Sequence, residues 1–261
     1  MIKFFRHIRQ NLIMENKTGK YFKYAIGEII LVVIGILIAL QINNWNEDRK
    51  SRAQEQNYYC LLLENIQQDK QQVLQLKALN EERRNGSHEA ILEIQKEKPK
   101  AEVFGKSWIN ALQRVTTSFK PNNATYSDIK SSGNLSIIQD KAITGALNTY
   151  YTNVAGYAET IIKNTDFIMD RIKSLDNWFE TGVHQVNIFS RYNKEIFTEA
   201  IRKRIKEDSP EYISESYKPI LYDAILITGT DYGRRQQLLE LIENEVDILQ
   251  QLLEKKCNSN D

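Results

Sequence analysis

The sequence contains little of what metal centres and disulfide frameworks need, with only 2 cysteines and 3 histidines in 261 residues. Zinc and iron–sulfur sites take most of their ligands from these two residue types. We therefore assign no metal ligand and no cofactor. Proline and glycine are also scarce, with 4 and 11 residues. This composition excludes a collagen-like chain and argues against a disordered chain rich in both residues.

Neither sign of charge predominates. The chain carries 35 Lys and Arg against 34 Asp and Glu, a formal net charge of +1. Proteins that bind nucleic acid are expected to show a basic excess, so we expect no nucleic-acid partner.

The familiar catalytic motifs are missing as well. The sequence has no HExxH, CxxC, GxSxG or Walker-type motif. Ser127 and Lys130 match SxxK, but the SDN and KTG elements that accompany this motif in penicillin-binding enzymes do not occur. We therefore assign no catalytic residue and expect a protein that is not an enzyme.

One long apolar run is present, at residues 25–42 (AIGEIILVVIGILIALQI). As a helix these residues extend about 27 Å, close to the roughly 30 Å hydrocarbon thickness of a bilayer. The alternatives are a buried core helix and a cleavable signal peptide. The run is longer than a usual signal-peptide core, and no small-x-small cleavage pattern follows it. The sequence therefore predicts an uncleaved, single-pass signal anchor over residues 25–42.

Charges around this run predict its orientation. Six basic residues precede it with one acid, whereas the three basic residues that follow are mixed with acids. The positive-inside rule then places residues 1–24 in the cytoplasm and residues 43–261 in the periplasm, with the anchor in the cell inner membrane. Within residues 1–14 apolar side chains recur at helical spacing between basic ones, which predicts either an amphipathic helix on the leaflet or a basic tail that only sets topology.

Several residues of the anchor are candidates for contacts within the membrane. Gly27, Gly35 and Ala39 lie on one face at multiples of four, where small side chains permit close approach of a second helix. Glu28 lies near one end, where it either extends to the headgroups or contacts a partner helix. Trp45 is the aromatic side chain expected at the opposite interface.

Beyond the anchor, apolar residues recur every three or four positions. The pattern is clearest over residues 143–179 and 239–253, and it is typical of helices packed on helices in the coiled-coil manner. No segment alternates with period two, so we expect no sheet. We therefore predict an all-α fold, in which the transmembrane helix is followed by an antiparallel bundle of long helices over residues 43–261.

Turn and cap residues predict where these helices begin and end. We expect a helix over residues 45–84 that ends at Gly86, a shorter one over 89–95, and another over 103–115. Thr125 is the expected N-cap of a short helix, with Asp128 completing a capping box and Gly133 closing it. Asp140 is the expected N-cap of the longest helix. Further helices are expected near residues 194–206, 217–227 and 232–256.

The two cysteines, Cys60 and Cys257, fall near the same expected end of this bundle. A disulfide would need an oxidising compartment and Cα atoms within about 7 Å. Two unpaired thiols are the favoured reading of the sequence, and a disulfide is the alternative.

Two runs of the sequence resemble a known family. They are YAIGEIILVVIGILIALQINNWNEDRK at residues 24–50 and ATYSDIKSSGNLSIIQD at residues 124–140. Both are similar to segments of an uncharacterised family found mainly in Bacteroidota, domain of unknown function 6090. The resemblance implies a single-span membrane protein, and it implies no activity or catalytic residue.

Three functions are consistent with these features. The first is a non-enzymatic envelope protein that binds a protein partner or another copy of itself. The second is a sensing module with a small-molecule pocket between its helices, which would need a separate signalling partner. Its pocket would be lined by aromatic residues that serve equally well as core: Trp108, Tyr126, Tyr150, Tyr151, Tyr157 and Trp178. The third, an enzyme without a recognisable motif, ranks last.

Overall fold

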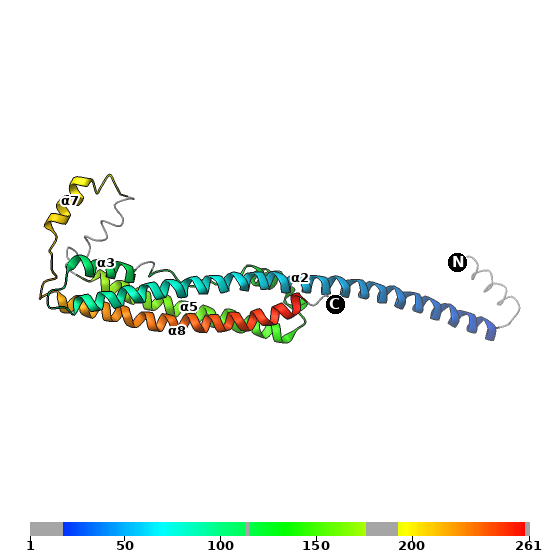
Figure 1. Ribbon diagram of the computed structural model, residues 1–261. Coiled ribbons are helices and arrows are strands. Elements are labelled where there is room, and N and C mark those ends of the chain that lie inside the picture. The colour runs from blue at the N-terminus through cyan, green and yellow to red at the C-terminus, as the bar shows by residue number, and fades with distance from the viewer. Residues whose placement is uncertain (1–17, 113–114, 176–192, 259–261) are drawn as a thin grey trace. The chain divides into compact units, whose positions relative to one another are not determined.

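The computed structural model describes residues 18–112, 115–175 and 193–258, and these residues contain helices and no strand (Figure 1). An isolated antiparallel bridge joins Lys100 to Tyr212. The all-α class is therefore confirmed. The helices are α2 (Thr18–Ile94), α3 (Ala101–Leu112), α4 (Ala124–Ser131), the 3-10 helix η1 (Asn134–Ile137), α5 (Lys141–Lys173), α7 (Glu199–Asp208) and α8 (Lys218–Cys257).

The chain divides into two compact units, Met1–Asn57 and Tyr58–Asp261. Helix α2 contributes to both. In the first unit the described residues form the N-terminal part of α2, and this part includes the apolar run at residues 25–42. The second unit holds the rest of α2 and all the other helices, and the two units are described separately below.

Three long helices build the second unit, and side-chain pairs along them show their directions. Helix α8 runs antiparallel to α2, because Lys70 pairs with Asp247 at 2.8 Å and the later Lys77 pairs with the earlier Glu243 at 2.6 Å. It also runs antiparallel to α5, since Asp140 pairs with Lys256 and Arg171 with Asp223. Helices α2 and α5 are consequently parallel to each other (Figure 1). The predicted antiparallel packing holds for α8 against α2 and against α5.

Two parallel helices need a long crossover, and residues 95–140 supply it. Helix α3 packs against the end of α2 near Gly86, and an extended segment then returns along α2, where Lys120 lies beside Gln72 and Thr125 beside Asn65. Helix α4 and η1 complete the return. We call residues 115–123 the strap, because they lie along the bundle without helical structure.

The predicted end of a helix at Gly86 is wrong, because α2 continues to Ile94. A β-carbon built on Gly86 would lie 2.6 Å from the backbone nitrogen of Ala111 and 2.9 Å from the carbonyl oxygen of Ser107. The glycine therefore allows α3 to approach α2 closely, and it does not stop the helix.

The predicted break between residues 227 and 232 is also wrong, since α8 is one helix of 40 residues. Gly229 and Gly233 lie inside it. The hydroxyl of Thr228 donates to the carbonyl of Ala224 at 2.7 Å, and that of Thr230 donates to the carbonyl of Ile227 at 2.8 Å. Both hydroxyls are thus satisfied within the helix and do not compete with it.

The caps were predicted with mixed success. Asp140 caps α5 by accepting from the backbone of Ala142 and Ile143, and Gly133 has the left-handed φ of 74° expected at the end of α4. Thr125 is not an N-cap, because α4 begins one residue earlier and the backbone N–H of Thr125 donates to Asn65 of α2 instead.

Helix lengths differ from expectation too. Helix α5 is not the longest, since its 33 residues compare with 77 in α2 and 40 in α8. It ends at Lys173, and the later part of its predicted stripe, residues 176–179, lies outside the described residues, as do residues 1–14 and the turn predicted near Gly182.

Two apolar clusters form the core of the second unit. The larger one lies at the end that contains both cysteines and is centred on residues such as Leu62, Leu147 and Ile242. The smaller one lies at the opposite end, where Phe104 and Trp108 of α3 pack against Leu221 and Ile225 of α8. The larger cluster uses the stripes predicted over residues 143–179 and 239–253, so hydrophobic periodicity identified this part of the core correctly.

Candidate functional site

The residues predicted to contact a membrane or a partner helix all lie in the first unit. Gly27, Gly35 and Ala39 are exposed, and no heavy atom lies within 4 Å of the position that a β-carbon would take on either glycine. Glu28 is half-buried. Trp45 is 61% exposed, and the guanidinium carbon of Arg49 lies 5.5 Å from the centre of its ring. Their proposed roles toward lipid or a partner helix stay predictions.

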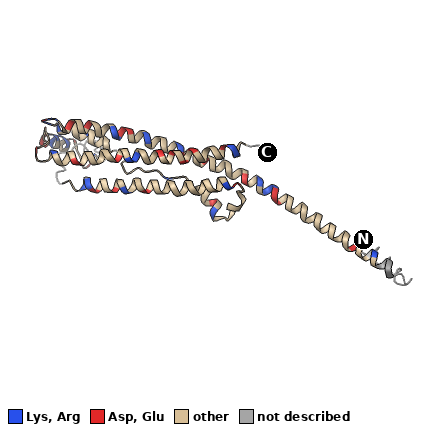
Figure 2. Cartoon of the chain, turned by 90° about the horizontal axis from the view of Figure 1, so that it is seen from below, with Lys and Arg blue, Asp and Glu red and all other residues tan. Residues whose placement is uncertain are grey.

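The apolar run itself is exposed, apart from the half-buried residues Ala25 and Glu28. Among the described residues, α2 is the one helix that is long and apolar enough to cross a membrane, by length and composition, and none of its most apolar window is buried. Its large side chains are roughly half exposed, from Ile26 at 54% to Ile42 at 62%. Figure 2 shows a long stretch of α2 free of Lys, Arg, Asp and Glu, with charged residues on both sides, and in the sequence this charge-free stretch is residues 29–46.

In the second unit Cys60 and Cys257 form a disulfide, with Cα atoms 5.0 Å apart. The sequence argument favoured unpaired thiols, because proximity could not be derived from spacing. The antiparallel register of α2 and α8 explains the pairing, since it brings the beginning of the α2 segment in the second unit beside the end of α8. The disulfide therefore joins residues separated by 197 positions in sequence.

A layer of polar side chains separates the two apolar clusters. Its members are all at least nine-tenths buried, and we call them the polar layer: Asn80, Arg83 and Ser87 of α2, Thr165 of α5, and Thr228, Asp231 and Arg235 of α8. In each helix they occupy the same three-and-four stripe as the apolar core. A stripe that continues from Leu76 through polar residues to Ala90 was the sequence signal that would have found the layer.

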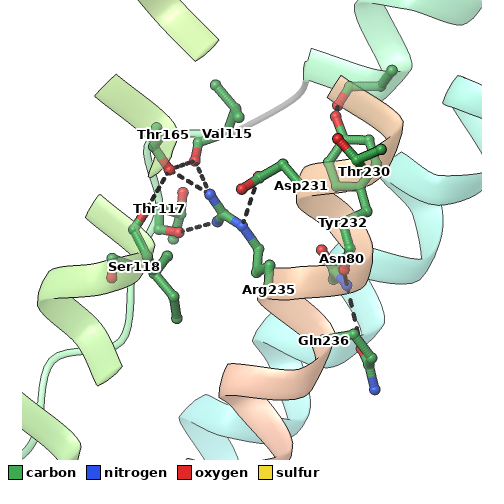
Figure 3. Close-up of polar contacts among 12 residues, drawn as sticks. Asn80, Val115, Thr117, Ser118, Thr165, Thr230, Asp231, Tyr232, Arg235 and Gln236 are labelled. Atoms are coloured by element: carbon green, nitrogen blue, oxygen red, sulfur yellow. Dashed lines mark hydrogen bonds and ion pairs between the residues drawn. The ribbon is translucent and has the colours of Figure 1, made fainter. Parts of the chain in front are cut away.

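Arg235 is the centre of this layer (Figure 3). Its guanidinium donates to the carbonyl oxygens of Val115 at 2.9 Å and Thr117 at 3.0 Å, and to the hydroxyl of Thr165 at 2.5 Å. Its Nε lies 3.7 Å from the carboxylate of Asp231. The carbonyls of the strap have no hydrogen-bond partners within a helix, and the guanidinium of Arg235 donates to two of them. The same guanidinium contacts Thr165, so it links the strap to α5 and α8.

Burial shifts the pKa values of the ionisable groups in this layer. Desolvation, together with the nearby charge of Arg235, lowers the pKa of Arg83 to about 10. Desolvation raises the pKa of Asp231, although both arginines oppose the shift. Buried ionic groups of this kind are weak contributors to stability but can fix the register of packed helices. Because the layer is closed to solvent, we interpret it as a structural feature that holds the strap and the three long helices together.

A second set of polar contacts holds the strap on α2. Asn65, Gln68, Asp69 and Gln72 lie on one face of α2, at spacings of three and four. Gln72 accepts from the backbone of Lys120 at 2.6 Å and donates back to its carbonyl at 3.0 Å. The buried Asp69 accepts from the backbone of Asn122 at 2.8 Å and from the hydroxyl of Tyr150 at 2.7 Å. Burial raises the pKa of Asp69, while these two hydrogen bonds act in the opposite sense.

The aromatic residues considered for a pocket belong mostly to the core. Trp108, Tyr126 and Tyr150 are buried, Tyr151 and Tyr157 pack at the edge of the larger cluster, and Trp178 lies outside the described residues. An open cleft of about 360 Å³ is lined by other residues: Ile94, Gln95, Glu215, Lys218, Pro219 and Tyr222. Across it the amide of Gln95 donates to the hydroxyl of Tyr222 at 3.1 Å. Within the described part of the chain, no three His, Cys, Asp or Glu side chains are grouped to hold a metal ion.

Comparison with known proteins places this helical chain in a family. Residues 28–200 match the model described as "Family of unknown function (DUF6090)", and because the match covers more than half of the chain, the protein belongs to that family. No curated protein and no solved structure matches.

Proposed function

We propose that this protein is a single-pass membrane protein of the cell envelope whose helical bundle binds or scaffolds a partner without catalysing a reaction. The observation that supports the proposal most strongly is the exposed apolar run at residues 25–42. Leaving a run of this length in water would oppose the hydrophobic effect, at roughly 25 cal/mol for each Å² of apolar surface. A bilayer covers that surface without any further folding of the chain.

The disulfide supports the proposed orientation by a separate argument. Disulfides persist in oxidising compartments such as the periplasm and are rare in the cytosol. The Cys60–Cys257 bond therefore favours a periplasmic location for residues 43–261, in agreement with the positive-inside rule and with an anchor in the inner membrane.

The proposed partner is a protein, or a second copy of this chain, that contacts the anchor. Gly27, Gly35 and Ala39 present no large side chain to a neighbouring helix, which favours close packing in lipid. Replacing Gly35 with Leu should abolish crosslinking of the anchor to such a partner, because the larger side chain keeps the helices apart. Leu37→Ile, on the opposite side of the helix, should leave crosslinking unchanged.

Membrane fractionation tests the anchor directly. Wild-type chain should stay in the membrane pellet at alkaline pH. Replacing both Val33 and Ile34 with Lys should release it, because each charge at mid-bilayer costs roughly 2.5–3.5 kcal/mol. The matched control is Leu61→Lys, at a position of the bundle that is 37% exposed, and this variant should stay in the pellet.

Two results would contradict the proposal. One is recovery of the wild-type chain in the soluble fraction without detergent, and the other is a mature form that begins after residue 42. A C-terminal alkaline phosphatase fusion tests orientation, since it is active only if the bundle is periplasmic.

The open cleft favours a second candidate function, a module that senses a small molecule. Its lining combines the apolar residues Ile94 and Pro219 with the charged residues Glu215 and Lys218. A ligand bound there should raise the melting temperature of the chain. Replacing Tyr222 with Ala should remove that rise, and a metabolite screen without any rise would contradict this function.

A further inference from the structure

The open cleft lies between the end of α2 and the start of α8, and its polar side chains have hydrogen-bonding capacity to spare. The ammonium of Lys218 donates to the backbone carbonyl of Lys96 at 2.7 Å, which fixes its position and leaves its other N–H groups for a second acceptor. The hydroxyl of Tyr222 accepts from the amide nitrogen of Gln95 at 3.1 Å, so its own proton remains a donor and the amide oxygen remains an acceptor.

A carboxylate lines the same cleft as the Lys218 ammonium. Glu215 precedes Lys218 by three positions, and its side chain is exposed whereas that of Lys218 is half-buried. Within the part of the chain that the structure describes, no ion pair joins the two side chains. Two opposite charges therefore border the cleft, and each is available to a group of the other sign on a ligand.

The charge and the size of the cleft restrict the class of that ligand. One cation and one carboxylate give the lining a net charge near zero, which favours a ligand that is neutral overall. The volume of about 360 Å³ lies at the small end of the roughly 300–1,000 Å³ that ligand pockets occupy. Ile94 and Pro219 add aliphatic surface to the lining, so a short apolar group of the ligand would also be covered.

We infer that the cleft binds a free amino acid with an apolar side chain, in its zwitterionic form. The carboxylate of the amino acid accepts from Lys218 and Tyr222, and its ammonium donates to Glu215 and to the amide oxygen of Gln95. Its side chain packs on the aliphatic part of the lining. The inference rests on the second candidate function above, the sensing module, and names the class of ligand for that module.

Three matched ligands test the need for both charges. L-leucine carries both, 4-methylpentanoate lacks the ammonium, and 3-methylbutylamine lacks the carboxylate. Isothermal titration calorimetry of the full-length protein in phosphatidylcholine nanodiscs, with empty nanodiscs as the blank, measures the three affinities. L-leucine should bind at least ~10-fold more tightly than either analogue, because each analogue leaves one charged side chain of the cleft without a partner.

Variants at the two charges should separate the analogues. Glu215→Gln should weaken binding of L-leucine about 10-fold and leave binding of 4-methylpentanoate unchanged, since that analogue has no ammonium. Lys218→Gln keeps a donor for the carbonyl of Lys96; it should weaken L-leucine about 10-fold and leave 3-methylbutylamine unchanged.

Glu240→Gln and Lys255→Gln are the matched controls, because both residues are exposed on α8 and neither lines the cleft. They remove the same charges and should change the affinity for L-leucine less than about twofold. All four variants should keep the melting temperature of the wild type without ligand, which shows that a loss of binding is not a loss of folding.

Three results would overturn the inference: no binding of L-leucine to the wild type, equal binding of the two analogues and L-leucine, or wild-type affinity in both cleft variants. If another class of metabolite raises the melting temperature and Tyr222→Ala removes that rise, the sensing function stands and the ligand class is wrong. If no metabolite raises it and L-leucine does not bind, both fail.

Discussion

At the scale of single residues, Gly86 shows how tertiary packing overrides local preference. Alanine is favoured over glycine by about 1 kcal/mol inside a helix, and α2 is helical on both sides of this residue. The β-carbon would nevertheless meet backbone atoms of Ala111 and Ser107, which cannot move without shifting α3. We expect Gly86→Ala to lower the free energy of unfolding by about 1–3 kcal/mol, as overpacking does.

Gly156→Ala is the matched control for this prediction. Gly156 lies inside α5, is exposed, and has no heavy atom within 4 Å of its β-carbon position. Its substitution should raise the free energy of unfolding by about 0.5–1 kcal/mol. Urea denaturation of both variants measures the difference, and equal effects would contradict the role given to Gly86.

Asp69 and Asp140 predict opposite dependences of stability on pH. Burial raises the pKa of Asp69 in the folded chain above its ordinary value of 3.8. As the pH rises above 3.8, the unfolded chain therefore loses this proton before the folded chain does. The stability of the fold falls until the pH has passed the folded pKa. The hydrogen bond from Lys256, the largest cause, lowers the pKa of Asp140, so its contribution is present above 3.8 and is lost as pH falls through the folded pKa.

Melting temperatures of Asp69→Asn and Asp140→Asn across the acidic range test these signs. Relative to wild type, Asp69→Asn should gain stability as pH rises from below 3.8, whereas Asp140→Asn should lose it. If both variants follow the wild-type profile, the carboxylates do not titrate differently in the folded and unfolded chain.

At the scale of elements, the polar layer makes a strong prediction at Arg235. Removing this side chain leaves the carbonyls of Val115 and Thr117 and the carboxylate of Asp231 without their buried cation. We expect Arg235→Ala to lower the free energy of unfolding by about 3–5 kcal/mol, the cost of breaking a buried pair. Hydrogen exchange should also show loss of protection in the strap.

The neighbouring Arg234 serves as the control, because it is exposed and its contact is a hydrogen bond to Gln237. Arg234→Ala should change the free energy of unfolding by less than about 0.5 kcal/mol. A cycle with Asp231→Asn isolates the ion pair, and the double variant should be less destabilised than the sum of the two single variants.

The elements also show how far sequence reasoning could reach. Apolar stripes identified the all-α class, the stripe of α5 up to its end, and most of the core, because each depends on local periodicity. The continuity of α2 and α8 was missed because Gly86 and Gly229 resemble helix ends in a sequence, and only the structure shows that both helices continue through them.

The polar contacts of the second unit were missed for a related reason. Arginine, asparagine and glutamine side chains usually lie on solvated faces. This applies to Arg83 and Arg235 and to the Asn and Gln side chains that contact the strap. Their burial follows from a strap that needs hydrogen-bond partners, and the course of that strap depends on contacts between residues far apart in sequence.

At the scale of the whole molecule, the proposed anchor and the disulfide depend on each other, because the proposed topology would place both cysteines in an oxidising compartment. The Cys60–Cys257 bond closes a loop of 197 residues, which by chain entropy alone contributes up to about 5 kcal/mol. We expect Cys60→Ser and Cys257→Ser to lower the free energy of unfolding by the same amount, since each removes the same bond. Unequal losses in urea denaturation would contradict that account.

The same bond reports where the bundle resides. On the proposed topology, both thiols of the wild type should resist a maleimide reagent in cells until a reductant is added, because the periplasm would keep them oxidised. The variant with Lys at positions 33 and 34, which should fail to insert, would hold its bundle in a reducing cytosol. Its thiols should therefore react without reductant, and Leu61→Lys should behave as wild type. If the cysteines of the non-inserting variant are oxidised, the disulfide forms without membrane insertion. The disulfide would then no longer support a periplasmic location of the bundle.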